Sequence, residues 1–174
     1  MLFVCTANIS RSAYAERRAA QLLGDDGGRL VNVASAGVAH HPGRSMDEQM
    51  AAQLRERGGD PSGHVSRPLS GELLDESHFV LTFEFTHRIR ITDSWPDQEP
   101  KIFGFRQLAD AVTRVPTPGV GLELLDQAVA ARQPDGLNWD VPDPYRRGPK
   151  AARACAQTID EALDRILSAL APSR

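Results

Sequence analysis

The sequence predicts an α/β domain in which helices flank a parallel β-sheet, and three observations lead to this prediction. Short apolar runs of strand length alternate with longer segments whose apolar residues recur at helical spacing. Strands separated by helices form βαβ units, whose right-handed crossovers make the strands parallel. The chain has 174 residues, 41% of them hydrophobic, and no repeat or linker divides it. We therefore expect a single domain over residues 1–174 with its own core.

Four apolar runs are the predicted strands, at residues 2–4, 30–34, 79–83 and 101–103. Each run is short enough for a strand and too short for a typical helix. The chain therefore supplies a sheet of four strands.

Two helices are predicted in the N-terminal half. The first begins at Arg11 and ends near Gly24, because glycine commonly follows the last turn of a helix. The second begins at Ser45, which stands three residues before Glu48 as in a capping box, and ends at Gly58.

Two further helices are predicted in the C-terminal half. One covers residues 122–131, inside a Pro- and Gly-rich stretch at 113–139 that could form a lid or a specificity wall. The last runs from about Lys150 to Leu170. Its apolar stripe includes Cys155 and indicates an amphipathic helix packed on the sheet, so we expect Cys155 to be buried.

Composition and charge exclude several classes of protein. Twenty basic and 23 acidic residues leave a net charge of −3, which gives no broad basic surface for nucleic acid or anionic lipid. No apolar run approaches the roughly 18–20 residues that span a bilayer. The short apolar N-terminus lacks the basic flank of a signal peptide. We therefore expect a cytoplasmic protein with no nucleic-acid partner and no membrane partner.

The loop after the first strand is the most informative segment. Cys5 ends a predicted buried strand and Arg11 begins a helix, and ligands bind at this edge of open α/β sheets. Free backbone N–H groups and the helix dipole form an anion site there, and they favour the thiolate form of a cysteine. Arg11 can add a bidentate clamp suited to a tetrahedral oxyanion. The alternative is a core cysteine beside a solvated arginine.

Asp143 is the candidate proton donor. Phosphoryl transfer from an alcohol or phenol needs a group that protonates the leaving oxygen. Asp143 lies between Pro142 and Pro144, which stiffen the backbone and hold the carboxylate in a fixed place. Tyr145 follows and could line the pocket rim. The alternative is an ordinary Pro-rich turn with a solvated carboxylate.

Taken together, these segments resemble the low-molecular-weight protein tyrosine phosphatase family. The resemblance implies a three-layer fold, in which a four-stranded parallel sheet has helices on both faces, and hydrolysis of phosphotyrosine and other aryl phosphates. The matching segments occur in the family's order and spread over the chain apart from residues 113–139. They are Leu2-Phe3-Val4-Cys5 with Arg11-Ser12, Ser35-Ala36-Gly37, His64 with Arg67, Val80-Leu81-Thr82, and Asp143-Pro144-Tyr145.

The resemblance also implies a role for each matching residue. Cys5 is expected to be the nucleophile that forms a phosphocysteine intermediate, and Arg11 to bind the phosphate oxygens. Asp143 is expected to be general acid and then base, while Tyr145 packs on the aromatic ring of the substrate. Three groups complete the site: phosphate-binding Thr6, Ala7, Asn8, Ile9, Ser10, Arg11 and Ser12; loop support from Asn8, Ser12, Ser35 and His64; and a substrate rim of His40, His41, Tyr145 and Arg146. No metal and no cofactor is implied, because Arg11 and the loop amides supply the electrostatic stabilisation.

Several positions depart from the family pattern, among them Ala13, where proline is common, and His40 or His41, where an aromatic residue is common. Ser10 stands where many members carry a second cysteine, so Cys5 cannot form a disulfide within the loop. Ala7 stands where glycine is common, which would strain the loop if that position needs a positive φ. Arg146 replaces an aromatic residue. With Arg147 it either favours acidic sequence beside a phosphotyrosine or belongs to an ordinary solvated turn.

The implied partners are a phosphotyrosine-containing protein as substrate, such as a tyrosine kinase, and inorganic phosphate as product. The chain itself is expected to be a monomer or a weak dimer. An arsenate reductase on the same fold needs two further cysteines to relay a disulfide, and residues 82–95 contain none. A protein-arginine phosphatase is expected to have a small polar residue in place of Ile9. A catalytically silent phosphate-binding module would require that Ala7 or Ala13 spoils the loop.

The remaining histidines are assigned to roles outside the chemistry. His64 is expected to be a structural hydrogen-bond partner of the loop rather than a base. His40 and His41 are adjacent in a loop and have no accompanying ligand cluster, which argues against a metal site. Residues 87–90, His-Arg-Ile-Arg, lie near acidic residues and are expected to form a solvated helix face.

Overall fold

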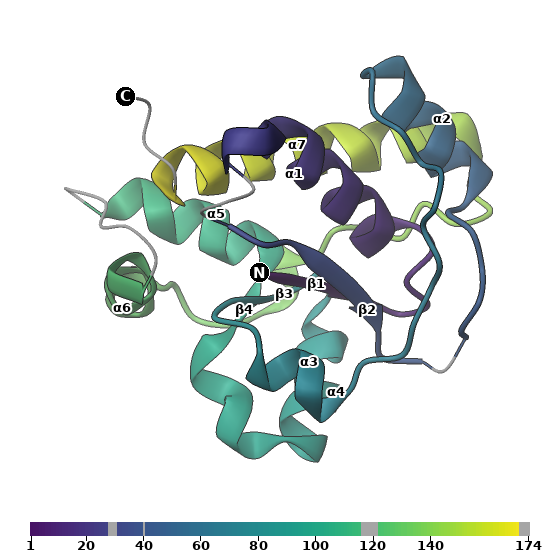
Figure 1. Cartoon of the computed structure of the whole chain (residues 1–174). Helices are drawn as coiled ribbons and strands as arrows, with labels where there is room; N and C mark the ends of the chain where they lie inside the picture. Colours follow the sequence, from purple (N-terminus) through teal and green to yellow (C-terminus); the bar gives the residue numbers. More distant parts are fainter. Residues whose placement is uncertain (28–30, 40, 116–121, 171–174) are drawn as a thin grey trace.

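The computed structural model of the chain describes residues 1–27, 31–39, 41–115 and 122–170. Its centre is a sheet of four parallel strands in the order β2-β1-β3-β4 (Figure 1). Their bounds are β1 (Leu2–Cys5), β2 (Ala34–Gly37), β3 (Val80–Thr82) and β4 (Ile102–Gly104). The predicted four-stranded parallel sheet is confirmed.

Helices cover both faces of this sheet and make three layers (Figure 1). One face carries α1 (Arg11–Gly27), α5 (Phe105–Arg114) and α7 (Gly148–Leu170), and the other carries α3 (Gly71–Asp75) and α4 (Phe85–Ser94). The helix α2 (Glu48–Glu56) packs on α7 and α1, and α6 (Leu122–Ala131) packs on α5. The predicted fold class is therefore correct, as are the helix at residues 122–131 and the long final helix.

Residue alternation along β1 explains how one short strand serves both faces. Successive strand side chains point to opposite sides of a sheet. Leu2 and Val4 accordingly join the core beneath α3 and α4, whereas Phe3 and Cys5 join the core beneath α1, α5 and α7. All four side chains are buried, and fully burying a side chain such as Phe3 or Leu2 stabilises the fold by about 1.5–3 kcal/mol.

The strand order places a topological switch point beside β1. The chain leaves β1 for β2 on one side and later returns to β3 on the other side. Crossovers that run in opposite directions leave a crevice at the carboxyl end of the strand between them, and ligands of open α/β sheets bind there. Cys5 is the last residue of β1, so it lies at this crevice.

Two sequence-based boundaries were wrong, and some elements were not expected. The second strand begins at Ala34, and residues 31–33 are not part of it, because pairing with β1 sets Phe3 opposite Ser35 and Cys5 opposite Gly37. Residue 30, where the strand was expected to begin, lies outside the described residues. The N-cap of α2 is Asp47, whose side chain accepts the N–H of Met50, rather than Ser45. The helices α3 and α5 and two short 3₁₀ helices, η1 (Pro96–Lys101) and η2 (Leu137–Trp139), were not expected.

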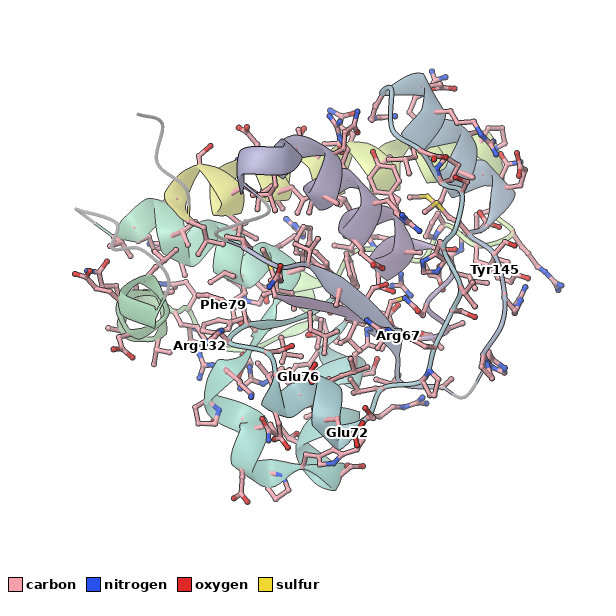
Figure 2. All side chains as sticks on the ribbon, in the orientation of Figure 1. Arg67, Glu72, Glu76, Phe79, Arg132 and Tyr145 are labelled. Carbon is pink, nitrogen blue, oxygen red and sulfur yellow. The ribbon has the colours of Figure 1, made fainter. Side chains whose placement is uncertain are left out.

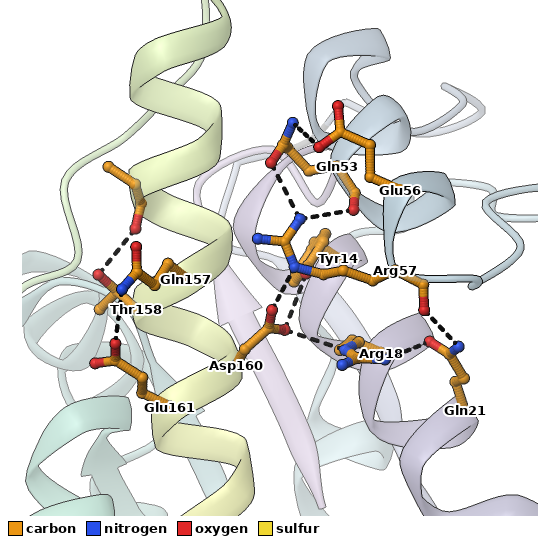
Figure 3. Close-up of polar contacts among 11 residues, drawn as sticks. Tyr14, Arg18, Gln21, Gln53, Glu56, Arg57, Gln157, Thr158, Asp160 and Glu161 are labelled. Carbon is orange, nitrogen blue, oxygen red and sulfur yellow. Dashed lines mark hydrogen bonds and ion pairs between the residues drawn. The ribbon is translucent and has the colours of Figure 1, made fainter.

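Asp160 of α7 joins three helices through one carboxylate (Figure 3). It accepts hydrogen bonds from Tyr14 and Arg18 of α1 and from Arg57 at the end of α2. Burial and the charge of Asp160 raise the pKa of Tyr14, which therefore stays a neutral hydrogen-bond donor. This cluster fixes α1, and hence the loop before it, against α7 and α2.

Among residues 113–139, those that the structure describes do not line the site, where a lid or a specificity wall was expected. Their helix α6 packs on α5, and the cavity beside Cys5 is lined by none of the residues described from this stretch. Residues 116–121 lie outside the described part of the chain.

None of the described helices combines the length and the apolar character that a membrane crossing requires.

Candidate active site

The loop between β1 and α1 forms the floor of a cavity of about 230 Å³. Its walls come from the loop itself, from the segment after β2 and from the segment before α7. The lining residues are Cys5, Thr6, Ala7, Ile9, Ser10, Arg11, His41, Arg44, Asp143 and Tyr145. The structure thus brings together most of the site residues that the sequence predicted.

The loop backbone is oriented with its carbonyl groups outward. The carbonyl oxygens of Cys5 and Thr6 accept the N–H groups of Val38 and Ala39, at 2.9 and 2.8 Å, and that of Ile9 accepts from Asp47 at 2.7 Å. By contrast, within the described residues the backbone N–H groups of residues 6–10 donate no hydrogen bond. Unpaired N–H groups at a helix N-terminus form an anion-binding cradle.

Asn8 holds the loop in this shape. Its φ of 55° is in the left-handed region, which non-glycine residues seldom adopt. Its side chain compensates with three hydrogen bonds: Nδ2 donates to the hydroxyls of Ser12 and Ser35, at 3.0 and 2.7 Å, and Oδ1 accepts from the backbone N–H of Arg67 at 3.0 Å. The carbonyl of Asn8 accepts from Nε2 of His64 at 2.7 Å.

The support residues predicted from the sequence all take part in this network. Ser35 accepts from Asn8 and donates to the carboxylate of Glu16, and His64 donates to the loop as a structural partner. Ala7, by contrast, is not among the positive-φ residues of the described chain. A glycine is therefore not required at position 7, and the expected source of strain is absent.

Gly37 allows the loop to lie against the end of β2. A Cβ atom at this position would stand 2.8 Å from the carbonyl oxygen of Thr6 and 3.1 Å from backbone atoms of Ala7 and Asn8. Because these neighbours are backbone atoms, any side chain at position 37 would push the loop away from the sheet. This accounts physically for the Ser35-Ala36-Gly37 segment.

Cys5 has a hydrogen-bond partner suited to a thiolate. Its Sγ lies 2.9 Å from Oγ of Ser12, which already accepts a hydrogen bond from Nδ2 of Asn8. The hydroxyl hydrogen of Ser12 is therefore available to Cys5. The second cysteine, Cys155, is buried in the core, as expected, and burial raises its pKa to about 12. Cys155 is thus a neutral thiol at physiological pH.

Arg11 is buried at the bottom of the cavity, with 1% of its surface exposed. Nη1 forms an ion pair with Glu84 and donates to the carbonyl of Val141 at 2.9 Å, and Nη2 lies 3.1 Å from Oδ2 of Asp143. Burial opposes the charge of Arg11, but Cys5, Asp143 and Glu84 outweigh it and raise the pKa. Its Nε has no partner among the described residues, which leaves one buried donor for a ligand.

The segment before α7 carries Asp143 to the cavity mouth. The backbone N–H of Val141 donates to the carbonyl of Phe83 at 2.8 Å, which ties the segment to the end of β3. Oδ1 of Asp143 accepts the N–H of Tyr145 at 3.2 Å, and Oδ2 faces Arg11. The carboxylate is half-exposed at the cavity mouth, and both of its oxygens contact neighbouring residues. Figure 2 shows Tyr145 on the side of the molecule toward which β1 and β2 point.

The sequence analysis missed Glu84 and His87, which lie beside the loop. Glu84 forms the ion pair with Arg11, and His87, 2% exposed, lies 3.0 Å through Nε2 from the hydroxyl of Thr6. Residues 87–90 were expected to form a solvated helix face, and this was wrong for His87 and Arg88. Both side chains are buried, and Arg88 forms an ion pair with Glu99. One sequence signal for this pair was available. Glu84 stands three residues before His87 at the start of a helix, which is the spacing of a capping box.

The protonation state of His87 follows from its partners. Nδ1 accepts the backbone N–H of Glu84 at 3.1 Å, so Nε2 carries the proton and donates it to Thr6. Burial, together with the charge of Arg11, lowers the pKa of His87 to about 4. Burial alone would raise the pKa of Glu84, but the hydrogen bond and charge of Arg11 reverse this and lower it. Near neutral pH the cluster therefore contains a neutral His87 and an ionised Glu84.

The predicted rim is placed in part. His41 and Tyr145 line the cavity, and Arg146 lies over the Tyr145 ring. His40 lies outside the described residues. Arg44, which the sequence analysis missed, also lines the cavity. Within the described ranges, no group of three or more His, Cys, Asp or Glu residues could hold a metal ion.

Comparisons with known proteins agree with this geometry. A low molecular weight protein-tyrosine-phosphatase (Ptp) of Acinetobacter johnsonii is 32% identical over 103 residues, which cover 59% of this chain and 69% of the relative. A protein-arginine-phosphatase of Geobacillus stearothermophilus is 26% identical over 170 residues, 98% of this chain and 95% of the relative. An arsenate reductase of Staphylococcus aureus is 35% identical over 80 residues, 46% of this chain and 56% of the relative.

A solved structure shares the whole fold. Vibrio vulnificus Wzb in complex with benzylphosphonate superposes with a TM-score of 0.72 at 26% identity, covering 96% of this chain and 95% of Wzb. A sequence model described as low molecular weight phosphotyrosine protein phosphatase matches residues 1–120. This range contains the loop from Cys5 to Arg11 and all four strands. The chain belongs to the low molecular weight phosphotyrosine protein phosphatase family.

Proposed function

We propose that this protein hydrolyses phosphotyrosine in proteins through a phosphocysteine intermediate. The observation that carries the proposal is the convergence of Cys5, Arg11 and Asp143 on one cavity above a loop of unpaired N–H groups. The cradle and the free Nε of Arg11 match the oxygens of a phosphate dianion.

In the first step, the thiolate of Cys5 attacks phosphorus and the bond from phosphorus to the phenolic oxygen breaks. Asp143, as the carboxylic acid, gives its proton to the departing oxygen, so tyrosine leaves neutral. Arg11 and the loop amides stabilise the charge on the equatorial oxygens. Nη2 of Arg11 lies 3.1 Å from Oδ2 of Asp143. The bound phosphate competes for this Nη2, and this competition releases the carboxyl group of Asp143 toward the leaving oxygen.

In the second step, water attacks the phosphorus of the phosphocysteine. Asp143, now a carboxylate, takes a proton from this water, the sulfur–phosphorus bond breaks, and inorganic phosphate leaves. Ser12 stabilises the returning thiolate through the contact at 2.9 Å. Every proton transfer is assigned to Asp143 and the reaction needs no added metal.

The choice of phosphotyrosine rests on the cavity walls. Ile9 is apolar and 4% exposed at the loop, and Tyr145 presents a ring at the mouth. A flat phenyl ring fits between such surfaces, whereas a guanidinium group calls for polar partners. We also infer that the protein acts in the cytoplasm on a phosphotyrosine protein such as a tyrosine kinase, because both described cysteines are free and a nucleophilic thiol persists in a reducing compartment.

The test compares p-nitrophenyl phosphate, a phosphotyrosine peptide and a phosphoarginine peptide, without divalent metal. Cys5→Ser should abolish turnover, and Asp143→Asn should lower kcat about 10²- to 10⁴-fold. The matched controls are Cys155→Ser and Asp164→Asn, the latter exposed on α7. Faster cleavage of phosphoarginine would reassign the substrate. Phosphate binding without turnover by the folded protein would indicate a silent binding module.

A further inference from the structure

The mouth of the cavity carries a concentration of positive charge that the proposed reaction does not use. Arg44 and Arg146 lie against Tyr145, although the whole chain has a net charge of −3. A local basic surface on an acidic protein is a feature of electrostatic recognition, because it steers and orients an anionic partner.

Arg44 is held in place by both its backbone and its side chain. Its backbone N–H donates to the hydroxyl of Ser66 at 2.9 Å, and its carbonyl accepts from the N–H of Ser66 at 2.8 Å. Its Nη2 donates to the hydroxyl of Tyr145 at 3.3 Å, and its guanidinium carbon lies 5.9 Å from the centre of the Tyr145 ring. The guanidinium is thus preorganised at the cavity wall.

Arg146 is positioned by an unusual backbone conformation. It has a φ of 59° at the third position of a turn that is closed by the N–H of Arg147 and the carbonyl of Pro144, 3.0 Å apart. Glycine or asparagine is the usual residue where a turn needs a positive φ. This conformation sets the guanidinium carbon of Arg146 5.2 Å from the centre of the Tyr145 ring.

Neither guanidinium has a carboxylate partner in the described part of the chain. Asp143, the one carboxylate among the described residues that line the cavity, pairs with Arg11 in the protein without substrate. Hydrogen bonds from Arg44 and Arg146 lower the pKa of Tyr145, which is the response expected of a hydroxyl in a positive field. The two arginines therefore keep their charge available for a ligand.

We infer that the substrate carries a second negative charge beside its phosphorylated residue, and that Arg44 and Arg146 bind it. This rests on the proposed function. The second charge is a carboxylate or a further phosphate, since a guanidinium binds both in the same bidentate way. Both arginines lie against Tyr145, which lines the cavity above Cys5, so this charge belongs to a residue that flanks the phosphorylated one.

The experiment measures kcat/KM for three phosphotyrosine peptides of one sequence. The neighbouring positions carry glutamate, glutamine of equal size, or a second phosphotyrosine. Wild type is compared with Arg44→Gln, Arg146→Gln and the double variant. The control Arg165→Gln removes an equal charge from an exposed site on α7. The readout is the ratio of kcat/KM for acidic over glutamine peptide within each protein, which cancels any general loss of activity.

We expect the wild type to prefer the glutamate peptide, each single variant to lose about two- to five-fold of that preference, and the double variant to lose all of it. The change should fall in KM and should shrink as salt rises from about 0.05 to 0.5 M. If the doubly phosphorylated peptide is preferred over the glutamate peptide, the source of the second charge is a neighbouring phosphotyrosine. If the two peptides are cleaved equally well, the source is acidic sequence.

Equal kcat/KM for the glutamate and glutamine peptides in the wild type would overturn the inference. A preference that persists in the double variant, or that Arg165→Gln reduces as much, would do the same. Failure of the proposed function is a different result: no phosphotyrosine peptide of any sequence would be cleaved, and the inference would fail with it.

Discussion

Glu84 forms an ion pair with Arg11, which stands 73 positions earlier in the chain, and so fixes the guanidinium from the side of α4. The pair joins the first residue of α1 to the N-cap of α4 across the carboxyl edge of the sheet. Because Nη1 is held by Glu84 and Val141, the rest of the guanidinium remains oriented for phosphate. Positioning of this kind is a large part of phosphoryl-transfer catalysis.

Replacing Glu84 therefore tests whether this residue acts mainly by orienting Arg11 or by placing a negative charge near the phosphate. Glu84→Gln removes a negative charge near the phosphate, which by itself would strengthen anion binding, but it also weakens the contact that orients Arg11. We expect orientation to dominate, so kcat/KM for p-nitrophenyl phosphate should fall about 10- to 100-fold. The surface pair of Glu48 with Arg55 supplies the control, Glu48→Gln. An unchanged or higher kcat/KM would assign the pair a purely structural role.

The buried His87 predicts a pH dependence of stability. Its pKa is about 4 in the folded protein and ordinarily about 6.5, so the unfolded chain binds the proton more tightly. The free energy of unfolding should therefore be greatest above pH 6.5 and fall as the pH drops toward 4, by up to about 3 kcal/mol at about 1.4 kcal/mol per pKa unit. Glu84, whose pKa is also lowered, adds a loss of the same sign.

Urea unfolding at several pH values measures this dependence. His87→Asn keeps polar groups for Thr6 and Glu84 but cannot titrate, so its stability should vary less between pH 4 and 6.5. His78→Asn removes an exposed histidine and serves as control. Parallel pH profiles for wild type and His87→Asn would refute the assignment.

Two substitutions of Asn8 distinguish the effect of its backbone strain from the effect of its side-chain hydrogen bonds. Asn8→Ala loses the three side-chain hydrogen bonds and keeps the left-handed φ of 55°. It should cost about 2–4 kcal/mol of stability. Asn8→Gly also loses these hydrogen bonds, but glycine adopts the left-handed φ without strain. This variant should therefore be more stable than Asn8→Ala, while its kcat stays low. Equal activity of wild type and Asn8→Gly would mean that only the backbone conformation matters.

Ala7→Gly is the companion variant for the same loop. Because Ala7 does not adopt a positive φ, glycine should bring no gain in kcat and should cost a few tenths to about 1 kcal/mol through added freedom of the unfolded chain. A marked rise in kcat would restore the view that alanine strains the loop.

The hydrogen bonds of Asp160 predict that its replacement lowers the stability of the fold, although Asp160 does not line the cavity. Asp160→Ala leaves Tyr14, Arg18 and Arg57 without their shared acceptor, and half-buried donors without partners should cost about 2–4 kcal/mol. Asp164→Ala, exposed one turn later on the same helix, should change stability by less than about 0.5 kcal/mol. Thermal unfolding of the two variants decides the point, and similar melting temperatures would contradict it.

Local patterns in the sequence were sufficient for much of this protein. Apolar runs separated by amphipathic segments predicted the parallel sheet and the helices α1, α2, α6 and α7, because hydrophobic periodicity is a property of neighbouring residues. The helices α3 and α5 were not predicted. The Cys5-to-Arg11 loop could be recognised for the same reason, since nucleophile, amides and arginine lie within seven consecutive positions. The fixed position of Asp143 followed from its two flanking prolines.

Tertiary structure alone decided what surrounds that loop. Pairing with β1 selected Ala34–Gly37 as a strand in place of the more apolar residues before it, because the register places Gly37 beside Cys5, where only a glycine lets the loop approach. Glu84 and His87 come from the crossover between β3 and β4, and Arg44 comes from the crossover between β2 and β3. They reach the loop from Cys5 to Arg11 only when the parallel strands align their carboxyl ends. Such contacts join residues distant in sequence, and no local pattern encodes them.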